Sequence, residues 1–326
     1  MKIFKILVKK IFSMFGLEIS QKSNFNKNKS INLDISFYEL DQINEPILNY
    51  LQSLSLNNLS KRVKDISCNE PSDPNAISHI HSKLKENGIL VVPNFMSETD
   101  AQKIKLRVDE FLHPLELNKE TNELIETENY VIQGQKKLVN SYDEIANYSK
   151  PIIDIRSDKM DGDHGMVDIF NVDHLLGDLG SNIRNAYNKT WLVNLLRKYD
   201  EKIKPANLNI YINESVTKTR GFHVDIYKTN FKGFIYLTDV ETLDDGPYCF
   251  VKKTHSETPW RKINKLIGKI TPYPTDAPFL NPFDVVPVLG KKGTLVLSDQ
   301  SGVHRGMPQK IGAVRKAIVF NYNYSI

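Results

Sequence analysis

The feature that most constrains the fold is a series of short β-prone runs in the last third of the chain. From about residue 206 onward, runs rich in β-branched and aromatic residues alternate with turn signals such as DDGP at 244–247. Several short strands with regular turns are typical of a β-sandwich or a β-barrel. The expected strands cover residues 208–213, 222–227, 232–240, 248–251, 294–297 and 314–324.

Helical patterns precede this β region and predict a layer that covers it. Apolar residues recur at helical spacing over residues 36–66, 79–86 and 175–199. Gly88 ends the second of these helices, and residues 89–92 form a short strand after it. Ser97, with an aspartate three positions on, is close to a capping box and begins a further helix. Residues 114–165 are polar and show no clear periodicity.

Bulk composition indicates a globular protein with one large domain and an extension. The 326 residues are 40% hydrophobic and 25% charged, which is ordinary for such a protein. Two cysteines, Cys68 and Cys249, stand outside any CxxC pattern, which argues against a disulfide scaffold and suits a reducing compartment. We expect three parts: residues 1–35 as a basic amphipathic helix and linker, 36–78 as a helical extension, and 79–326 as the catalytic domain.

Positive charge is concentrated at the N-terminus. Residues 1–30 hold seven lysines and one glutamate, a net charge of +6. The whole chain carries +4, so the remainder sums to −2, and the body offers no broad basic surface for nucleic acid. The apolar residues of the first turns fall on one side of a helix: Phe4, Leu7, Val8, Ile11, Phe12 and Phe15.

A basic amphipathic helix at residues 1–17 has two readings. It either lies on a membrane surface or docks on its own domain or a partner. It is too short and too often interrupted by lysine to span a bilayer, and it lacks the apolar core and cleavage site of a signal peptide. We therefore expect a cytoplasmic protein with a peripheral membrane contact through residues 1–17 as one of the two readings.

A histidine and an aspartate stand two residues apart in one of the β-prone runs, GFHVDIY at 221–227. Side chains alternate along a strand, so His223 and Asp225 are expected on one face, where they could bind one metal ion. Two ligands hold a first-row metal weakly, and within the β region the other histidines are His255 and His304. His304 comes shortly after the expected strand at 294–297 and would lie at its end or beside it. Two histidines and one carboxylate form the facial triad of non-haem Fe(II) oxygenases.

An arginine in the last expected strand supplies a second signal. An oxygenase that uses 2-oxoglutarate must hold the far carboxylate of that acid, and an arginine offers a bidentate fork for it. Arg315 shares a strand face with Ala317 and Val319, which suits an arginine buried around an anionic ligand. Arg305 is a rival, but it adjoins His304 and should point elsewhere.

These residues resemble the phytanoyl-CoA dioxygenase-like family of Fe(II)/2-oxoglutarate oxygenases. The family pattern is HxD, a long gap, then a histidine and an arginine spaced as in HRGMPQKIGAVR at 304–315. Residues 86–104, ENGILVVPNFMSETDAQKI, resemble the family's strand-turn-helix entry. Residues 231–256 resemble the strands that follow HxD and end in a Gly-Pro turn and a Thr-His segment. The resemblance covers roughly residues 80–326.

The resemblance implies a fold and a chemistry. The fold would be an all-β core, a double-stranded β-helix (a cupin-like jelly roll) with flanking α-helices and the N-terminal helical extension. Fe(II) would be bound by His223, Asp225 and His304, and Arg315 would hold 2-oxoglutarate, with dioxygen as the second co-substrate. Asn209 is a further candidate contact to the co-substrate, and a solvated strand face is its alternative. Related halogenases lack the carboxylate, so Asp225 favours hydroxylation or another oxidation.

One segment departs from the family pattern, and the substrate stays open. The family often has a PGSH-like segment where this chain has KKTH at 252–255, and we expect His255 to be structural. The substrate is expected to be a small molecule or a glycan-linked or lipid-linked compound, with no nucleic acid. The alternatives are a non-catalytic β-helix that binds a ligand and a cupin-like metal enzyme of another reaction type.

Overall fold

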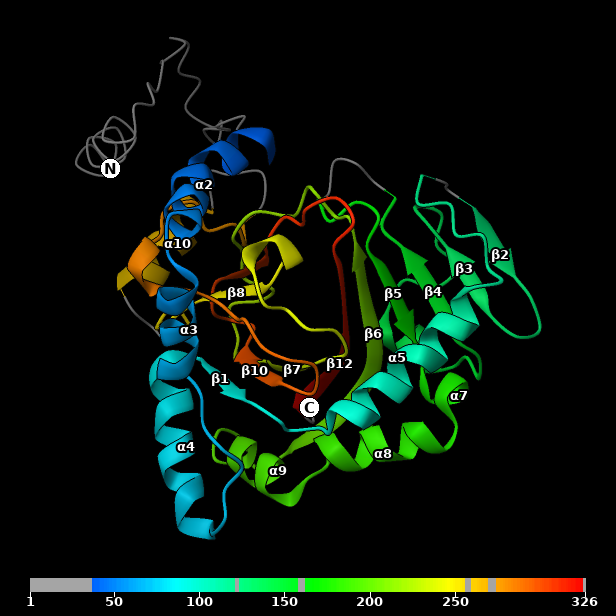
Figure 1. Ribbon diagram of the computed structural model, residues 1–326, viewed down its shortest axis with the longest axis horizontal. Coiled ribbons are helices and arrows are strands. Elements are labelled where there is room, and N and C mark those ends of the chain that lie inside the picture. The colour runs from blue at the N-terminus through cyan, green and yellow to red at the C-terminus, as the bar shows by residue number, and fades with distance from the viewer. Residues whose placement is uncertain (1–36, 121–122, 158–161, 256–258, 269–273, 325–326) are drawn as a thin grey trace, which may run out of the picture.

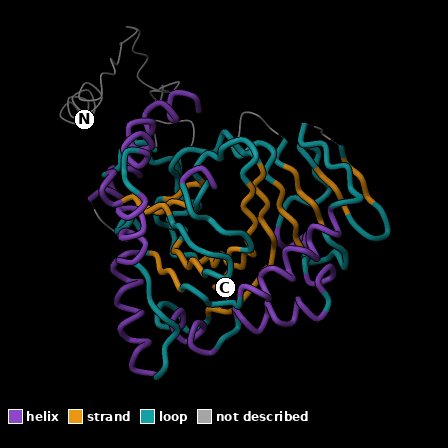
Figure 2. Tube along the Cα trace, in the orientation of Figure 1, coloured by secondary structure: helices purple, strands orange, loops and turns teal. Residues whose placement is uncertain are grey.

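The computed structural model describes residues 37–120, 123–157, 162–255, 259–268 and 274–324. Two β-sheets of very different size pack against each other, and helices lie outside them (Figures 1 and 2). The large sheet curves across the molecule, and the small sheet, which contains β8, lies over its middle part. The expected N-terminal helix at residues 1–17 lies outside the described residues.

The large sheet has nine strands in the order β1-β10-β7-β12-β6-β5-β4-β3-β2. Their bounds are Ile89–Val92 (β1), Leu124–Glu126 (β2), Val131–Gln133 (β3), Ile152–Ile155 (β4), Val167–Phe170 (β5), Ile203–Glu214 (β6), Phe231–Tyr236 (β7), Leu295–Asp299 (β10) and Val314–Tyr324 (β12). All neighbours pair antiparallel except β3 and β4, which pair parallel. A mostly antiparallel sheet with flanking helices therefore confirms the expected β core.

The small sheet has the order β11-β8-β9, with β8 at Tyr248–Val251, β9 at Val285–Pro287 and β11 at His304–Gly306. Its open side is extended by a single β-bridge between His223 and His304. The run at 222–227 is therefore not the regular strand that we expected. It is held by isolated bridges, one to His304 of β11 and one to Asp276 in a loop, and by loop hydrogen bonds.

The two faces of the large sheet have separate cores. Between the sheets, a cluster joins Phe234, Ala317 and Val319 of the large sheet to Phe250 and Val286 of the small sheet. The other face carries a larger apolar cluster that packs under helices. Its strand members include Leu208, Ile210, Ile212, Ile235, Leu297, Ile318 and Phe320.

Most helices lie on the outside of these sheets. Their bounds are Phe37–Gln52 (α2), Leu56–Asp65 (α3), Pro74–Asn87 (α4), Glu98–Leu112 (α5), Tyr142–Ile145 (α6), Asp173–Leu176 (α7), Asp178–Tyr187 (α8), Thr190–Arg197 (α9) and Pro259–Ile267 (α10), with short 3₁₀ turns at Leu243–Asp245 (η1) and Pro282–Asp284 (η2). Helices α4, α5, α8 and α9 pack on the large sheet, whereas α2 and α3 contact the small sheet and η2 (Figure 1).

Local signals placed several of these elements correctly. Gly88 ends α4 in the left-handed region at φ 77°, and a Cβ there would lie 2.3 Å from the His255 ring, so only glycine fits. Ser97 caps α5 by accepting a hydrogen bond from the Asp100 amide at 3.0 Å. By contrast, β2, β3 and β4 lie within residues 114–165, where the sequence pattern predicted no strand. These strands are only three or four residues long, so no period emerges from them, and pairing with distant partners forms them.

Candidate metal centre

Two histidines and an aspartate from three separate chain positions converge at one edge of the small sheet. The Nε2 atoms of His223 and His304 lie 3.7 and 3.5 Å from Oδ1 of Asp225. One potential ligand atom from each residue lies within 4.8 Å of the other two. Within the described parts of the chain, this is the one group of three or more such side chains found. The residues expected from the HxD motif and the distal histidine therefore meet.

The two imidazoles are oriented by backbone carbonyls. Nδ1 of His223 lies 2.8 Å from the Gly221 carbonyl, and Nδ1 of His304 lies 2.9 Å from the Gly302 carbonyl. A carbonyl only accepts, so each Nδ1 carries a hydrogen and donates it, which leaves Nε2 as the ring nitrogen that faces Asp225. Reciprocal backbone hydrogen bonds of 3.0 and 2.8 Å between the two residues hold the rings side by side, with centroids 4.7 Å apart. The Nε2 atoms of both rings are thus placed where they could bind a metal.

Asp225 divides its two oxygens between different partners. Oδ1 faces the histidines, and Oδ2 accepts a hydrogen bond of 2.7 Å from Nζ of Lys232 on β7. The backbone N–H of Asp225 donates to the Gln300 carbonyl at 3.1 Å. Because Lys232 occupies one oxygen, the carboxylate offers the other as a single ligand, and two histidines plus one such oxygen leave half of an octahedron open.

The charges around the cluster favour its ligating forms. Burial, together with the nearby His304 and Arg220, lowers the pKa of His223 well below its usual value, so this imidazole is neutral. Burial alone would raise the pKa of Asp225, but Lys232 and His304 outweigh it and hold that pKa well below its usual value. A neutral imidazole and an ionised carboxylate are the forms that bind a divalent metal.

Arg315 lies on the face of β12 that looks toward the small sheet. It pairs directly across from Asn213 on β6, and its Nη2 donates to Asn213 Oδ1 at 3.0 Å. Its Nη1 donates to the Gly246 carbonyl. A Cβ added at Gly306, two residues after His304, would lie 3.6 Å from Nη2 of Arg315. The guanidinium therefore lies beside the strand that carries His304, and burial lowers its pKa.

The rival Arg305 points elsewhere, as its position next to His304 predicts. It is 1% exposed, donates to Oγ1 of Thr219 at 2.8 Å and lies over the ring of Phe222 at 5.4 Å. Phe222 belongs to the cluster on the outer side of the small sheet, under α2. Successive residues of a strand face opposite sides, so His304 and Arg305 are separated.

Asn209 lies in the buried polar part of the large sheet. It is 0% exposed, and neither amide atom has a partner in good hydrogen-bond geometry, although the amide is close enough to Asp168 and Tyr142 to lower the pKa of each. On β5, Asp168 is 4% exposed and its Oδ1 also lacks a partner. Their strand partners place both on the face of Tyr211 and Lys232. Buried polar atoms without partners are costly, so this face is suited to a ligand with complementary groups.

Electrostatics link this polar face to the metal cluster. Burial raises the pKa of Asp168 to about 8, partly offset by Arg156, while Asp154 raises it further. Burial also raises the pKa of Tyr142, against the opposing effect of Lys232. The side chains of Arg156 and Tyr142 remain 43% exposed. These groups therefore lie close enough to influence one another while part of the face still meets solvent.

Lys232 and Asp168 were not among the candidate site residues predicted from the sequence. Each is a single charged residue in an apolar β-prone run, FKGFIY at 231–236 and VDIF at 167–170. A lone charge at an inward position of a strand is unusual and could have marked both. His255, in contrast, is buried away from the cluster with Nε2 3.0 Å from the Lys85 carbonyl, which agrees with a structural role.

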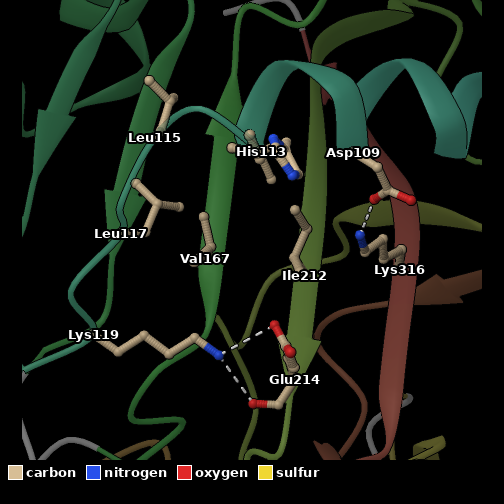
Figure 3. A pocket seen from close by; sticks show the side chains of 10 residues that line it. Asp109, His113, Leu115, Leu117, Lys119, Val167, Ile212, Glu214 and Lys316 are labelled. Atoms are coloured by element: carbon tan, nitrogen blue, oxygen red, sulfur yellow. Dashed lines mark hydrogen bonds and ion pairs between the residues drawn. The ribbon is translucent and has the colours of Figure 1, made fainter.

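A hollow lies on the helix-covered face of the large sheet, under the end of α5 (Figure 3). It measures about 320 Å³ and is lined by residues of α5, the following loop, β5, β6 and β12. Its charged side chains pair with each other, Lys316 with Asp109 and Lys119 with Glu214. Ile212 lines this hollow, whereas its strand neighbours Tyr211 and Asn213 face the opposite side.

Comparisons with known proteins give structural matches without sequence relatives. Neither the models of protein families nor the curated proteins match this sequence. One matching solved structure is the epimerase SnoN in complex with Fe3+, alpha ketoglutarate and nogalamycin RO, at 15% identity and a TM-score of 0.47, covering 77% of this chain and 84% of that chain.

Two further matches have similar statistics. HygX from Streptomyces hygroscopicus, with nickel and 2-oxoglutarate bound, is 10% identical with a TM-score of 0.45, covering 78% of this chain and 89% of that chain. The carbocyclase SnoK from nogalamycin biosynthesis is 16% identical with a TM-score of 0.45, covering 78% and 84%. Similarity this low does not by itself transfer an activity to this chain.

Proposed function

We propose that this protein is an Fe(II)- and 2-oxoglutarate-dependent dioxygenase of the phytanoyl-CoA dioxygenase-like type. The observation that carries the proposal is the convergence of His223, Asp225 and His304, with one ligand atom from each facing the others. A facial set of two histidines and one carboxylate is the ligand set of non-haem Fe(II) oxygenases. The matched enzymes SnoN and HygX, whose structures contain Fe3+ or nickel with the keto acid, are compatible with it.

The strand arrangement supports a double-stranded β-helix for the core. Strands β6, β12, β7 and β10 are consecutive in the large sheet. Facing them are the segment of His223, then β11, β8 and β9. Two four-membered layers of antiparallel segments, in which every sequence neighbour except the pair β8 and β9 lies on the opposite layer, are the pattern of a jelly roll. The metal cluster then lies near one end of the space between the layers.

The residues present fit an iron ion. Bound Fe(II) would supply coordination of 2-oxoglutarate and activation of dioxygen, the two co-substrates, for oxidation of a substrate carbon. His223 and His304 would bind through Nε2, because the Gly221 and Gly302 carbonyls hold the hydrogens on Nδ1. Lys232 would keep Asp225 monodentate by holding its second oxygen. The chain thus leaves room for a co-substrate that binds through two atoms.

Arg315 is proposed to bind the far carboxylate of 2-oxoglutarate. In the ligand-free chain its two terminal nitrogens already donate to Asn213 and the Gly246 carbonyl. These acceptors fix the plane of the guanidinium and leave further N–H groups for a carboxylate. Asn209, whose buried amide lies beside Asp168 and Tyr142, is proposed as a contact on the same polar face.

The substrate is proposed to be a small molecule or a glycan-linked or lipid-linked compound that is hydroxylated. The polar face near the metal cluster carries an amide, carboxyl groups, phenols and cations, and some of these groups are buried while others are exposed. Such a lining suits a substrate with several hydrogen-bonding groups. A peripheral membrane contact through residues 1–17 also remains a proposal, since those residues lie outside the described part of the chain.

Turnover of 2-oxoglutarate tests the assignment. The purified chain is incubated with Fe(II), ascorbate, 2-oxoglutarate and air, and succinate is measured over time. We expect succinate to form, and to form faster when a substrate is present. A binding titration of 2-oxoglutarate without oxygen accompanies it, because turnover without substrate is slow. We expect binding to need the metal.

A matched histidine variant serves as the control. His223→Ala should abolish both metal-dependent binding and succinate formation, whereas His174→Ala, an exposed histidine on α7, should change neither. If the unmodified chain binds Fe(II) but neither binds nor consumes 2-oxoglutarate, the protein is a ligand-binding β-helix or a metal enzyme of another reaction type.

A further inference from the structure

Helix α10 exposes two large apolar side chains and buries two polar ones. Trp260 is 48% exposed and Leu266 is 42% exposed, while Arg261 is 7% and Asn264 is 2% exposed. A helix on the surface of a globular protein normally does the opposite. Large apolar side chains that gather on an outward helix face mark an interaction surface.

The polar side of α10 is fixed to the loops that carry the metal ligands. Arg261 donates to the backbone carbonyls of His255 and Tyr227, and to Oγ of Ser301 at 3.3 Å. Nζ of Lys265 lies 5.2 Å from the centre of the Tyr227 ring. Tyr227 stands two residues after Asp225. Since these contacts determine which side of the helix faces inward, the outward position of the apolar side follows from them.

The outward face combines aromatic, aliphatic and basic residues. Lys262 is also exposed, and at 3.6 residues per turn it lies next to Leu266 on the helix surface. Ile226, in the loop that Arg261 holds, is 47% exposed. A tryptophan and an exposed lysine on one helix face are typical of helices that lie at the interface of a bilayer with anionic headgroups.

Charge argues against the chain's own N-terminal segment as the occupant of this face. Residues 1–30 carry a net charge of +6, so docking them beside Lys262 would bring like charges together. Both basic elements are instead complementary to one anionic surface.

We propose that the outward face of α10, formed by Trp260, Lys262 and Leu266, binds the surface of an anionic lipid bilayer. The loop of Asp225 would then lie beneath a single helix, about 10–12 Å in diameter. If the proposed function also holds, the metal centre would be close to substrates presented at the lipid surface. The docking itself does not depend on catalysis.

Vesicle co-sedimentation tests the proposal with the full chain. The vesicles contain equal parts phosphatidylglycerol and phosphatidylcholine, and pure phosphatidylcholine vesicles are compared. We expect the protein to pellet with the anionic vesicles. The double variant Trp260→Ser/Leu266→Ser should have a partition coefficient that is lower by about tenfold or more. The control is Leu106→Ser on α5, which is also 48% exposed and lies on the other side of the molecule (Figure 1).

Tryptophan emission gives an independent readout. The chain has two tryptophans, so Trp191→Phe leaves Trp260 as the one reporter. We expect its emission to shift to shorter wavelength when anionic vesicles are added, because the ring leaves water. Circular dichroism of each variant verifies that the fold is retained.

Three outcomes would overturn the proposal. Partitioning that the double substitution leaves unchanged would assign any membrane binding to residues 1–17 alone. An emission of Trp260 that does not shift would show that the face stays in water. A change of oligomeric state in the double variant, with no loss of vesicle binding, would assign the face to a second copy of the chain. Because none of these measurements uses turnover, they are independent of the proposed oxygenase activity.

Discussion

The two faces of strand β6 differ sharply although their residues alternate along the same backbone. Leu208, Ile210 and Ile212 are buried in the apolar cluster under the helices. Their neighbours Asn209 and Tyr211 face the other side, where Lys232 and Asp168 also lie. One face gains stability from burial of apolar area, and the other buries polar groups that lack partners.

Strand β12 repeats this contrast. Ile318 and Phe320 are 0% exposed on the helix side, while Arg315 lies on the side of the small sheet. Burial of polar groups with unmet hydrogen bonds costs free energy, and such costs persist in proteins where a site requires them. The helix-covered face is therefore mainly apolar, whereas the inter-sheet face combines an apolar cluster with the buried polar groups of the proposed site. Four changes would break or sharpen this distinction.

Loss of a metal ligand should have the largest effect. His304→Ala removes one of three ligand atoms, and loss of mere supporting partners already weakens metal binding by about 10–100-fold. We therefore expect Fe(II) affinity to fall by about 100-fold or more and 2-oxoglutarate turnover to reach background. A fluorescence competition titration with Fe(II) measures the first effect. Retained affinity would place the metal elsewhere.

Arg315 should control co-substrate binding without controlling the metal. A hydrogen bond to a charged group contributes about 1.5–3 kcal/mol, so Arg315→Ala should weaken 2-oxoglutarate binding by about 10–100-fold. Arg315→Lys keeps the charge but loses the bidentate fork, so its affinity for 2-oxoglutarate should lie between those of the unmodified chain and Arg315→Ala. An oxygen-free titration with metal present measures both variants. Equal affinity for all three proteins would exclude Arg315 as the anchor.

Two adjacent residues of β6 offer a direct test of the two faces. Ile210→Ala should lower the free energy of unfolding by about 2–5 kcal/mol, because it leaves a cavity in the core, and it should leave Fe(II) affinity unchanged. Asn209→Ala removes only the poorly aligned contacts of its amide to Asp168 and Tyr142, so it should cost less than about 1 kcal/mol and reduce turnover instead. Urea unfolding and succinate formation separate these outcomes. The reverse result would contradict the distinction between the faces.

The last test concerns the pH dependence of stability. Burial raises the pKa of Asp168 to about 8 in the folded chain, against about 3.9 for an unfolded aspartate. Between these values the folded state holds a proton that the unfolded state has lost. This contribution to stability is complete below about pH 4 and is lost as the pH rises through about 8, by up to about 1.4 kcal/mol per pH unit.

Asp168→Asn cannot ionise and therefore supplies the control for that titration. Its free energy of unfolding should change less between about pH 5 and about pH 8 than that of the unmodified chain. Urea unfolding at several pH values in this window measures the difference. Parallel pH profiles would show that Asp168 is ionised in the folded state.

Motifs and local periods anticipated the parts of the molecule that depend on neighbouring residues. The N-cap at Ser97, the glycine stop at Gly88 and the strand at Ile89–Val92 were predicted correctly. The strands β8 and β12 were also predicted with their observed bounds. The prediction of a regular strand around His223 was wrong, because this segment forms one isolated β-bridge on either side and no continuous ladder.

The alternation of side chains and the order of polar residues were determined by the sequence alone. They were sufficient to select His223, Asp225, His304 and Arg315, because the chemistry of a ligand set depends on residue type. Tertiary structure decided the partners: the Lys232 contact to Asp225, the burial of Asp168 and the outward turn of Trp260. These features depend on pairing between strands and loops far apart in the chain, and no local pattern specifies how distant segments pack.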